Sequence, residues 1–245
     1  VKVDPVQESQ KVVENAQLLQ AQGIEDVALR EFERAISINP RITPAYLGIG
    51  QIHRRKGNLV EALSAYINAA AIEPGNFDAQ YGVGLTSQLL GRIADAIRAY
   101  VNALYIRPDD FDANLNLATA YLQFGEPSPA LPYAQRAVRL KGDSGPARFN
   151  LGAIYSAAGD YESAIVEYRQ AAEAYELAAH RFPLAKGGNQ EGHDLDSYSH
   201  PEGHSERKLV RRIEVKGKGV PWRGSETVEM SDSQFGHAVA RKSDG

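Results

Sequence analysis

One regular spacing recurs along the chain from residue 9 to residue 178. Pro40, Pro74 and Pro108 are evenly spaced, and Gly142 takes the next place in the series. Three further positions keep one residue type through five copies: Gly23, Gly57, Gly91, Gly125 and Gly159; Ala28, Ala62, Ala96, Ala130 and Ala164; and Ala35, Ala69, Ala103, Ala137 and Ala171. A period of about 34 residues indicates one supersecondary unit copied along a solenoid.

Each copy reads as a pair of antiparallel helices, and residues 43 to 76 illustrate the pattern. Thr43 is predicted to cap the first helix, with Pro44 in the first turn, where no N–H partner is needed. Gly57 should end that helix in the left-handed conformation, and a second helix should run from about Leu59 to just before Pro74. One such hairpin cannot bury its own apolar face, so neighbouring copies must stack.

This pattern resembles the tetratricopeptide repeat family, and the resemblance spans residues 9 to 178. It implies an all-α solenoid of ten antiparallel helices in a right-handed superhelix. The predicted repeats are residues 9–42, 43–76, 77–110, 111–144 and 145–178. The fourth repeat departs from the pattern, with Ala134 in the aromatic position and Pro132 inside the predicted second helix, which Pro132 should kink or delay.

The resemblance also implies a concave groove, lined by the first helix of each repeat, that binds a peptide or partner protein. The residues in the groove positions are Gln17, Gln51, Tyr81, Asn116, Phe149 and Asn150. Asn116 and Asn150 are equivalent, and a side-chain amide both donates and accepts, so they could pair with the backbone of an extended peptide. Alternatively, both asparagines are solvated or bond to local backbone.

Charged residues narrow the class of ligand. The family's clamp for C-terminal carboxylates uses lysines and an arginine, but its positions here hold Val13, Gln17, Gly48, Asp78 and Gly82. A receptor for chaperone tails is therefore not expected. Arg54, Arg55 and Lys56 form a dense basic run, which is either a site for an acidic peptide or a set of cations stabilising a helix C-terminus.

Composition excludes several other classes. The 245 residues contain no cysteine, so a disulfide framework and a thiolate metal site are both impossible. A net charge of −4 argues against a protein that coats nucleic acid. The chain has no apolar run of about 18 residues, so we expect no membrane helix. We also expect no cofactor in the repeats and a cytoplasmic location.

Residues 179–245 lack the repeat and predict a small α/β segment. Ile213 and Val215 alternate with Glu214 and Lys216, which is the two-residue period of a strand. The stretches 193–199 and 208–217 are both strand-like, and residues 231–245 look like a capped helix.

The stretches "GHDLDSYS" and "RRIEVKGKG" resemble the nuclease-like family of the NO VEIN C-terminal region, which has the PD-(D/E)xK fold. The resemblance implies that Asp194 and Glu214 hold Mg²⁺, while Lys216 orients water and stabilises charge on the phosphate. That family continues with another core strand beyond the place of Gly245, so we expect a partial domain.

Three classes of function follow. The first is a scaffold that binds an extended peptide in the groove, and five intact repeats favour it. The second is a Mg²⁺-dependent nuclease whose repeats recruit partners, with nucleic acid as a partner only if the C-terminal domain is complete. The third is a structural spacer, which the aromatic groove residues Tyr81 and Phe149 argue against.

The C-terminal hypothesis is testable with metal. If Asp194 and Glu214 form a pair, their mutual repulsion should be relieved by Mn²⁺, and Glu214→Gln should abolish binding in isothermal titration. An assay on duplex and single-stranded DNA should then show no cleavage, as expected for a partial nuclease domain. Equal Mn²⁺ binding by the wild type and Glu214→Gln would remove the metal site.

Overall fold

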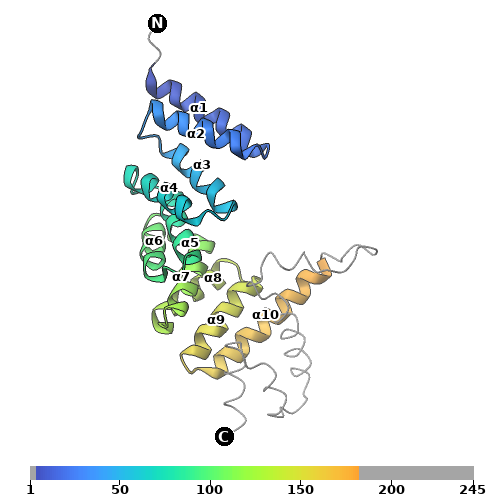
Figure 1. Ribbon diagram of the computed structural model, residues 1–245. Coiled ribbons are helices and arrows are strands. Elements are labelled where there is room, and N and C mark those ends of the chain that lie inside the picture. Colours follow the sequence, from blue (N-terminus) through green and yellow to red (C-terminus); the bar gives the residue numbers. More distant parts are fainter. Residues whose placement is uncertain (1–3, 182–245) are drawn as a thin grey trace. The chain divides into compact units, whose positions relative to one another are not determined.

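The computed structural model describes residues 4–181, and within that range every regular element is an α-helix (Figure 1). The helices are α1 (Pro5–Ala21), α2 (Glu25–Ile38), α3 (Thr43–Arg55), α4 (Leu59–Ile72), α5 (Phe77–Leu89), α6 (Ile93–Ile106), α7 (Phe111–Gln123), α8 (Pro127–Leu140), α9 (Gly145–Ala157) and α10 (Tyr161–Arg181). The prediction of ten helices in an all-helical repeat array is thereby confirmed. Of the predicted α/β segment at 179–245, the first three residues belong to α10 and residues 182–245 lie outside the described residues.

The glycines of the repeat end the first helix of each hairpin. Gly57 has a φ of +78°, in the left-handed region, as predicted. Its N–H donates to the carbonyl of Arg54 at 3.1 Å, and the N–H of Asn58 donates to the carbonyl of His53 at 2.9 Å. These bonds satisfy carbonyls that the end of a helix would otherwise leave unpaired. The equivalent glycines 23, 91, 125 and 159 have the same conformation, with φ between 73° and 85°.

A polar side chain caps most of the first helices, one residue before the helix begins. Asn76 accepts a hydrogen bond from the N–H of Ala79 at 3.1 Å, and Asp110 accepts from Ala113 at 2.9 Å. In the second repeat this place is taken by Ile42, which has no side-chain acceptor. The prediction that Thr43 caps α3 is therefore wrong, because Thr43 is already the first helical residue and its side chain is buried.

Pro132 does not delay the helix that contains it. α8 begins at Pro127, the same repeat position that Ile93 holds at the start of α6. Pro127 and Pro129 both fall in the first turn, where a missing N–H leaves no partner unsatisfied. Pro132 lies inside the helix and removes one N–H donor, while its fixed φ suits a helical backbone.

The first three hairpins pack on one another through a glycine against an aromatic ring. A Cβ on Gly48 would lie 2.3 Å from Cζ of Phe32, and a Cβ on Gly82 would lie 2.5 Å from Cδ1 of Tyr66. Both rings belong to the second helix of the preceding repeat, and both are almost fully buried. The absent side chain on each first helix is thus the space that the preceding ring fills.

The turn between repeats is held by a side chain that donates to a backbone carbonyl six residues earlier. The four bonds run from Tyr46 to Pro40 (3.2 Å), Gln80 to Pro74 (3.2 Å), Asn114 to Pro108 (2.9 Å) and Arg148 to Gly142 (2.8 Å). A phenol, two amides and a guanidinium therefore make the same contact. Gly142 can stand in the proline series because only its carbonyl is used.

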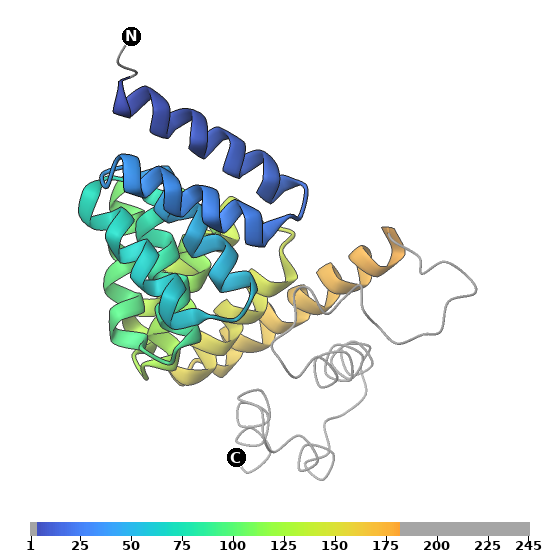
Figure 2. The same ribbon diagram turned by 45° about the horizontal axis from the view of Figure 1, so that its top comes forward.

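The chain divides into two compact units, α1–α7 and α8–α10. In the first unit α1 packs on α2, α3 on α4 and α5 on α6, and the first helices α1, α3, α5 and α7 also contact one another in sequence. Figure 2 shows α1 and α2 side by side. In the second unit α9 contacts both α8 and α10. None of the helices described is both long and apolar enough to cross a membrane.

The packing of glycine against the ring predicts a selective loss of stability. Gly82→Ala should lower the free energy of unfolding by about 1–3 kcal/mol, because Tyr66 must move to admit the methyl group. Gly75→Ala is the matched control, since a Cβ there meets no atom within 4 Å. Urea denaturation followed by circular dichroism would measure both variants. A similar midpoint for the two would contradict this account of the packing.

Candidate functional site

Side chains of neighbouring first helices bond to one another across one face of the first unit. Three hydrogen bonds define this face: Gln20 Nε2 to Gln51 Oε1 at 3.1 Å, Gln88 Nε2 to Gln123 Oε1 at 2.9 Å, and Asn116 Nδ2 to the Tyr81 hydroxyl at 2.8 Å. The first joins α1 to α3, and the other two join α5 to α7. We call the surface formed by these six residues and their helical neighbours the odd-helix face.

Tyr81 lies at the centre of the α5–α7 part of this face. Its ring stacks on Phe77, with centroids 5.6 Å apart, and tilts against Tyr100 at 5.8 Å. Burial raises the pKa of Tyr81 to about 12, and the carboxylates of Asp112 and Asp110 add to the rise. Tyr81 is therefore a neutral phenol at physiological pH, fixed by two rings and one amide.

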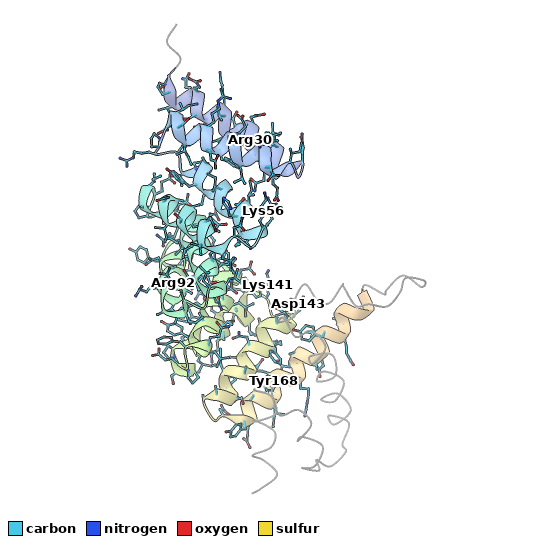
Figure 3. All side chains as sticks on the ribbon, viewed as in Figure 1. Arg30, Lys56, Arg92, Lys141, Asp143 and Tyr168 are labelled. Carbon is cyan, nitrogen blue, oxygen red and sulfur yellow. The ribbon has the colours of Figure 1, made fainter. Side chains whose placement is uncertain are left out.

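The phenol of Tyr100, on the second helix α6, connects the core of the first unit to the same face. The Tyr100 hydroxyl donates to Gln88 Oε1 at 2.8 Å, and Gln88 passes the connection on to Gln123. Burial raises the pKa of Tyr100 and of Tyr168, the latter labelled in Figure 3. These phenols keep their protons, and Tyr100 holds the Gln88 amide in one orientation.

The six residues predicted to line the groove are divided between the two units. Gln51, Tyr81 and Asn116 lie on the odd-helix face, each bonded to a residue of a neighbouring first helix. Gln17 is an exposed residue of α1. Phe149 and Asn150 are half-buried residues of α9 in the second unit, where the Phe149 ring tilts against Tyr168 at 5.3 Å. Their role in binding a peptide remains a prediction.

The basic run at the end of α3 is engaged within the protein. Arg55 pairs with Glu25 at 3.0 Å, and Lys56, labelled in Figure 3, pairs with Asp26. The hydrogen bond from Lys56 is the main reason why the pKa of Asp26 is lowered. Both acids begin α2, where they also suit the helix dipole. The structure thus disfavours the alternative in which this run binds an acidic peptide.

Arg54 completes this set. It hydrogen-bonds to the phenol of Tyr66, which partly offsets the rise that burial causes in the pKa of Tyr66. All three cations of the run therefore have a partner in the first unit.

The sequence prediction missed Gln20, Gln88 and Gln123, which make two of the three bonds that define the face. A signal was present, because Gln20 and Gln88 are separated by two full periods and hold the same repeat position. A second signal was that Glu25 and Asp26 precede their partners, Arg55 and Lys56, by the same number of residues. Neither signal is visible when one repeat is inspected alone.

The predicted metal and catalytic residues Asp194, Glu214 and Lys216 lie outside the described residues. Within residues 4–181, no group of three or more histidine, aspartate or glutamate side chains is placed to hold a metal ion. The nuclease alternative and its Mg²⁺ remain predictions, to be tested by the Mn²⁺ titration.

The surroundings of Tyr81 predict a change in its titration. Asp112→Asn should lower the pKa of Tyr81 from about 12, because the carboxylate disfavours a phenolate beside it. NMR of ¹³C-tyrosine-labelled protein would follow the titration, with Tyr81→Phe identifying the signal. Since folding raises this pKa above its ordinary value near 10, the stabilisation is present below pH 10 and is lost as the pH rises toward 12. Glu61→Gln on α4 is the control and should leave the titration curve of Tyr81 unchanged. If Asp112→Asn also left that curve unchanged, the carboxylate of Asp112 would not act on Tyr81 as stated.

Comparisons with known proteins agree with this architecture. The crystal structure of MamA protein has a TM-score of 0.65 at 19% identity, covering 72% of this chain and 96% of that one. YrrB, described as a TPR protein with an unusual peptide-binding site, has a TM-score of 0.64 at 20% identity and covers 70% and 91%. MamA from Desulfovibrio magneticus RS-1 gives 0.64 at 17% identity, with 72% and 98% covered. At these identities the likeness shows the fold.

A search of curated proteins finds no significant match. A family profile described as tetratricopeptide repeat matches residues 13–79, 89–145 and 115–179, which together cover more than half of the chain. The chain therefore belongs to the tetratricopeptide repeat family.

Proposed function

We propose that the protein is an interaction scaffold whose odd-helix face binds an extended segment of a partner protein. The observation that carries this proposal is the set of side-chain amides bonded across neighbouring first helices. A primary amide has two N–H donors and an acceptor with two lone pairs. Each bond of this set uses only part of that capacity, and the remainder is suited to the N–H and C=O groups of a peptide backbone.

The same bonds prepare the face for binding. Gln88 is held from one side by Tyr100 and from the other by Gln123, and Asn116 is held by Tyr81. A side chain that is already fixed loses less rotamer entropy when a ligand arrives, so more of the interaction energy appears as affinity. A spacer that only separates two domains would need no such arrangement.

The comparisons support this proposal at the level of the family. Tetratricopeptide repeat proteins are interaction modules, and YrrB is described by its peptide-binding site. The amides Gln51 and Asn116, which the sequence placed in the groove, share the odd-helix face with amides that the sequence did not identify.

Peptide display tests the proposal directly. Residues 1–245 would be immobilised and used to select binders from a library of random twelve-residue peptides. Replacing Asn116 with alanine should weaken a peptide bound at the odd-helix face by about 1 kcal/mol, the usual cost of a lost hydrogen bond. Asn150→Ala, in the second unit, is measured as a separate variant. Tyr105→Ala is the control, because Tyr105 is 89% exposed on the second helix α6.

The contrast between the two variants decides the outcome. Peptides that lose affinity with Asn116→Ala and keep it with Tyr105→Ala support binding at the odd-helix face. Binders that keep their affinity in both asparagine variants would dismiss the amide pairing, and a library that yields none would contradict the proposed function.

A further inference from the structure

The α5–α7 part of the odd-helix face is nearly free of charged residues. Each helix has 13 residues, and each contains a single charged one, Asp78 in α5 and Asp112 in α7. The chain as a whole is 24% charged, which would give about three per helix. Loss of charge together with an aromatic centre is the composition of an interface core.

Both aspartates lie on the same side of their helices as the bonded amides. In α5, Asp78 precedes Tyr81 by three residues and Gln88 by ten, so the three share one helical face. In α7, Asp112 precedes Asn116 by four residues and Gln123 by eleven. The carboxylate of Asp112 also contributes, after burial, to the raised pKa of Tyr81, which agrees with this placement on the same face.

Neither aspartate is neutralised by the protein. Both side chains are exposed, and no ion pair among residues 4–181 involves either of them. Of the nearby cations, Arg55 is paired with Glu25, and Arg107 lies over the Phe77 ring at 4.3 Å. Arg54 is bonded to Tyr66 and also acts on Tyr81, so the Asp78 end of the face is less acidic than the Asp112 end.

Resting on the proposed function, we infer that the peptide bound by this face is basic, with lysine or arginine side chains that pair with Asp78 and Asp112 while its backbone meets the amides. The two residues are equivalent, one repeat apart, on helices in contact. Packed helices lie about 8–10 Å apart, and an extended chain advances about 3.3 Å per residue. Alternate side chains of an extended chain point to the same side, so cationic side chains two residues apart, about 6.6 Å along the chain, would reach both carboxylates through their long stems.

The aspartates could instead serve only to stabilise the N-termini of their helices, and the two roles can be distinguished. An acid in the first turn of a helix suits its dipole, so Asp→Asn should lower stability somewhat in either case. A dipole effect cannot make the protein prefer one peptide charge over another. The preference between charges is therefore the readout.

Three fluorescein-labelled nine-residue peptides of glycine, leucine and glutamine provide the test. They are identical except for two positions, two residues apart, which carry lysine, glutamine or glutamate. Fluorescence anisotropy should show the lysine peptide binding the wild type about three- to twentyfold more tightly than the glutamine peptide, by the usual strength of two exposed ion pairs. The glutamate peptide should bind weakest.

Variants of charged residues then test whether the preference for the lysine peptide comes from Asp78 and Asp112. Asp78→Asn/Asp112→Asn should bring the lysine and glutamine peptides to within about twofold, with Asp112→Asn causing the larger share of the loss. Asp112→Glu, which keeps the charge, should retain the preference. Glu33→Gln/Glu61→Gln changes the net charge by the same amount on α2 and α4 and should leave the preference intact.

The possible failures are distinct. If the peptides bind equally, or if the lysine preference survives Asp78→Asn/Asp112→Asn, the basic ligand is ruled out while the proposed scaffold function stands. If none of the three binds and display also yields no peptide, the inference falls together with the proposed function.

Discussion

The contact between a glycine of one hairpin and an aromatic ring of the hairpin before it brings the first helices α1, α3 and α5 together. Gly48 and Gly82 admit the rings of Phe32 and Tyr66 at distances that no side chain would allow. The ring is thereby buried, and the two first helices that flank it are brought into contact. The bond from Gln20 to Gln51 depends on that closeness, because amide side chains can bond only across helices that touch. At the next step the position equivalent to Gly48 and Gly82 holds Asn116, whose own side chain joins α7 to α5 through Tyr81.

The face and the core are therefore parts of one network. Tyr100 is a core residue, yet its hydroxyl reaches Gln88, which in turn bonds to Gln123 on the next first helix. Tyr81 is stacked on Phe77 and accepts a hydrogen bond from Asn116. The burial that stabilises the hairpins also orients the polar groups available to a ligand, which explains how a repeat built for stacking can present a prepared binding surface.

The sequence predicted the helices well because each boundary depends on local chemistry repeated five times. A glycine with positive φ ends the first helix, and this signal does not depend on the rest of the fold. Thr43 was misplaced because the capping position of its repeat holds Ile42. The delay expected from Pro132 does not occur, because the helix starts earlier, with Pro127 and Pro129 in the tolerant first turn. The amide pairs were harder to foresee, since they depend on the rotamers of residues 31 and 35 positions apart. The basic run was ambiguous for the same reason, because its partners lie on the preceding hairpin.

The side-chain amide signals of the odd-helix face offer the most direct test of the central claim that this face binds a peptide through its amides. An ¹H–¹⁵N NMR spectrum of the full chain would be recorded with and without a peptide selected by display. The NH₂ signals of Gln20, Gln51, Gln88, Gln123 and Asn116 should shift together, while that of Asn68, exposed on the second helix α4, should stay in place. Shifts at Asn68 without shifts at the face amides would contradict the account.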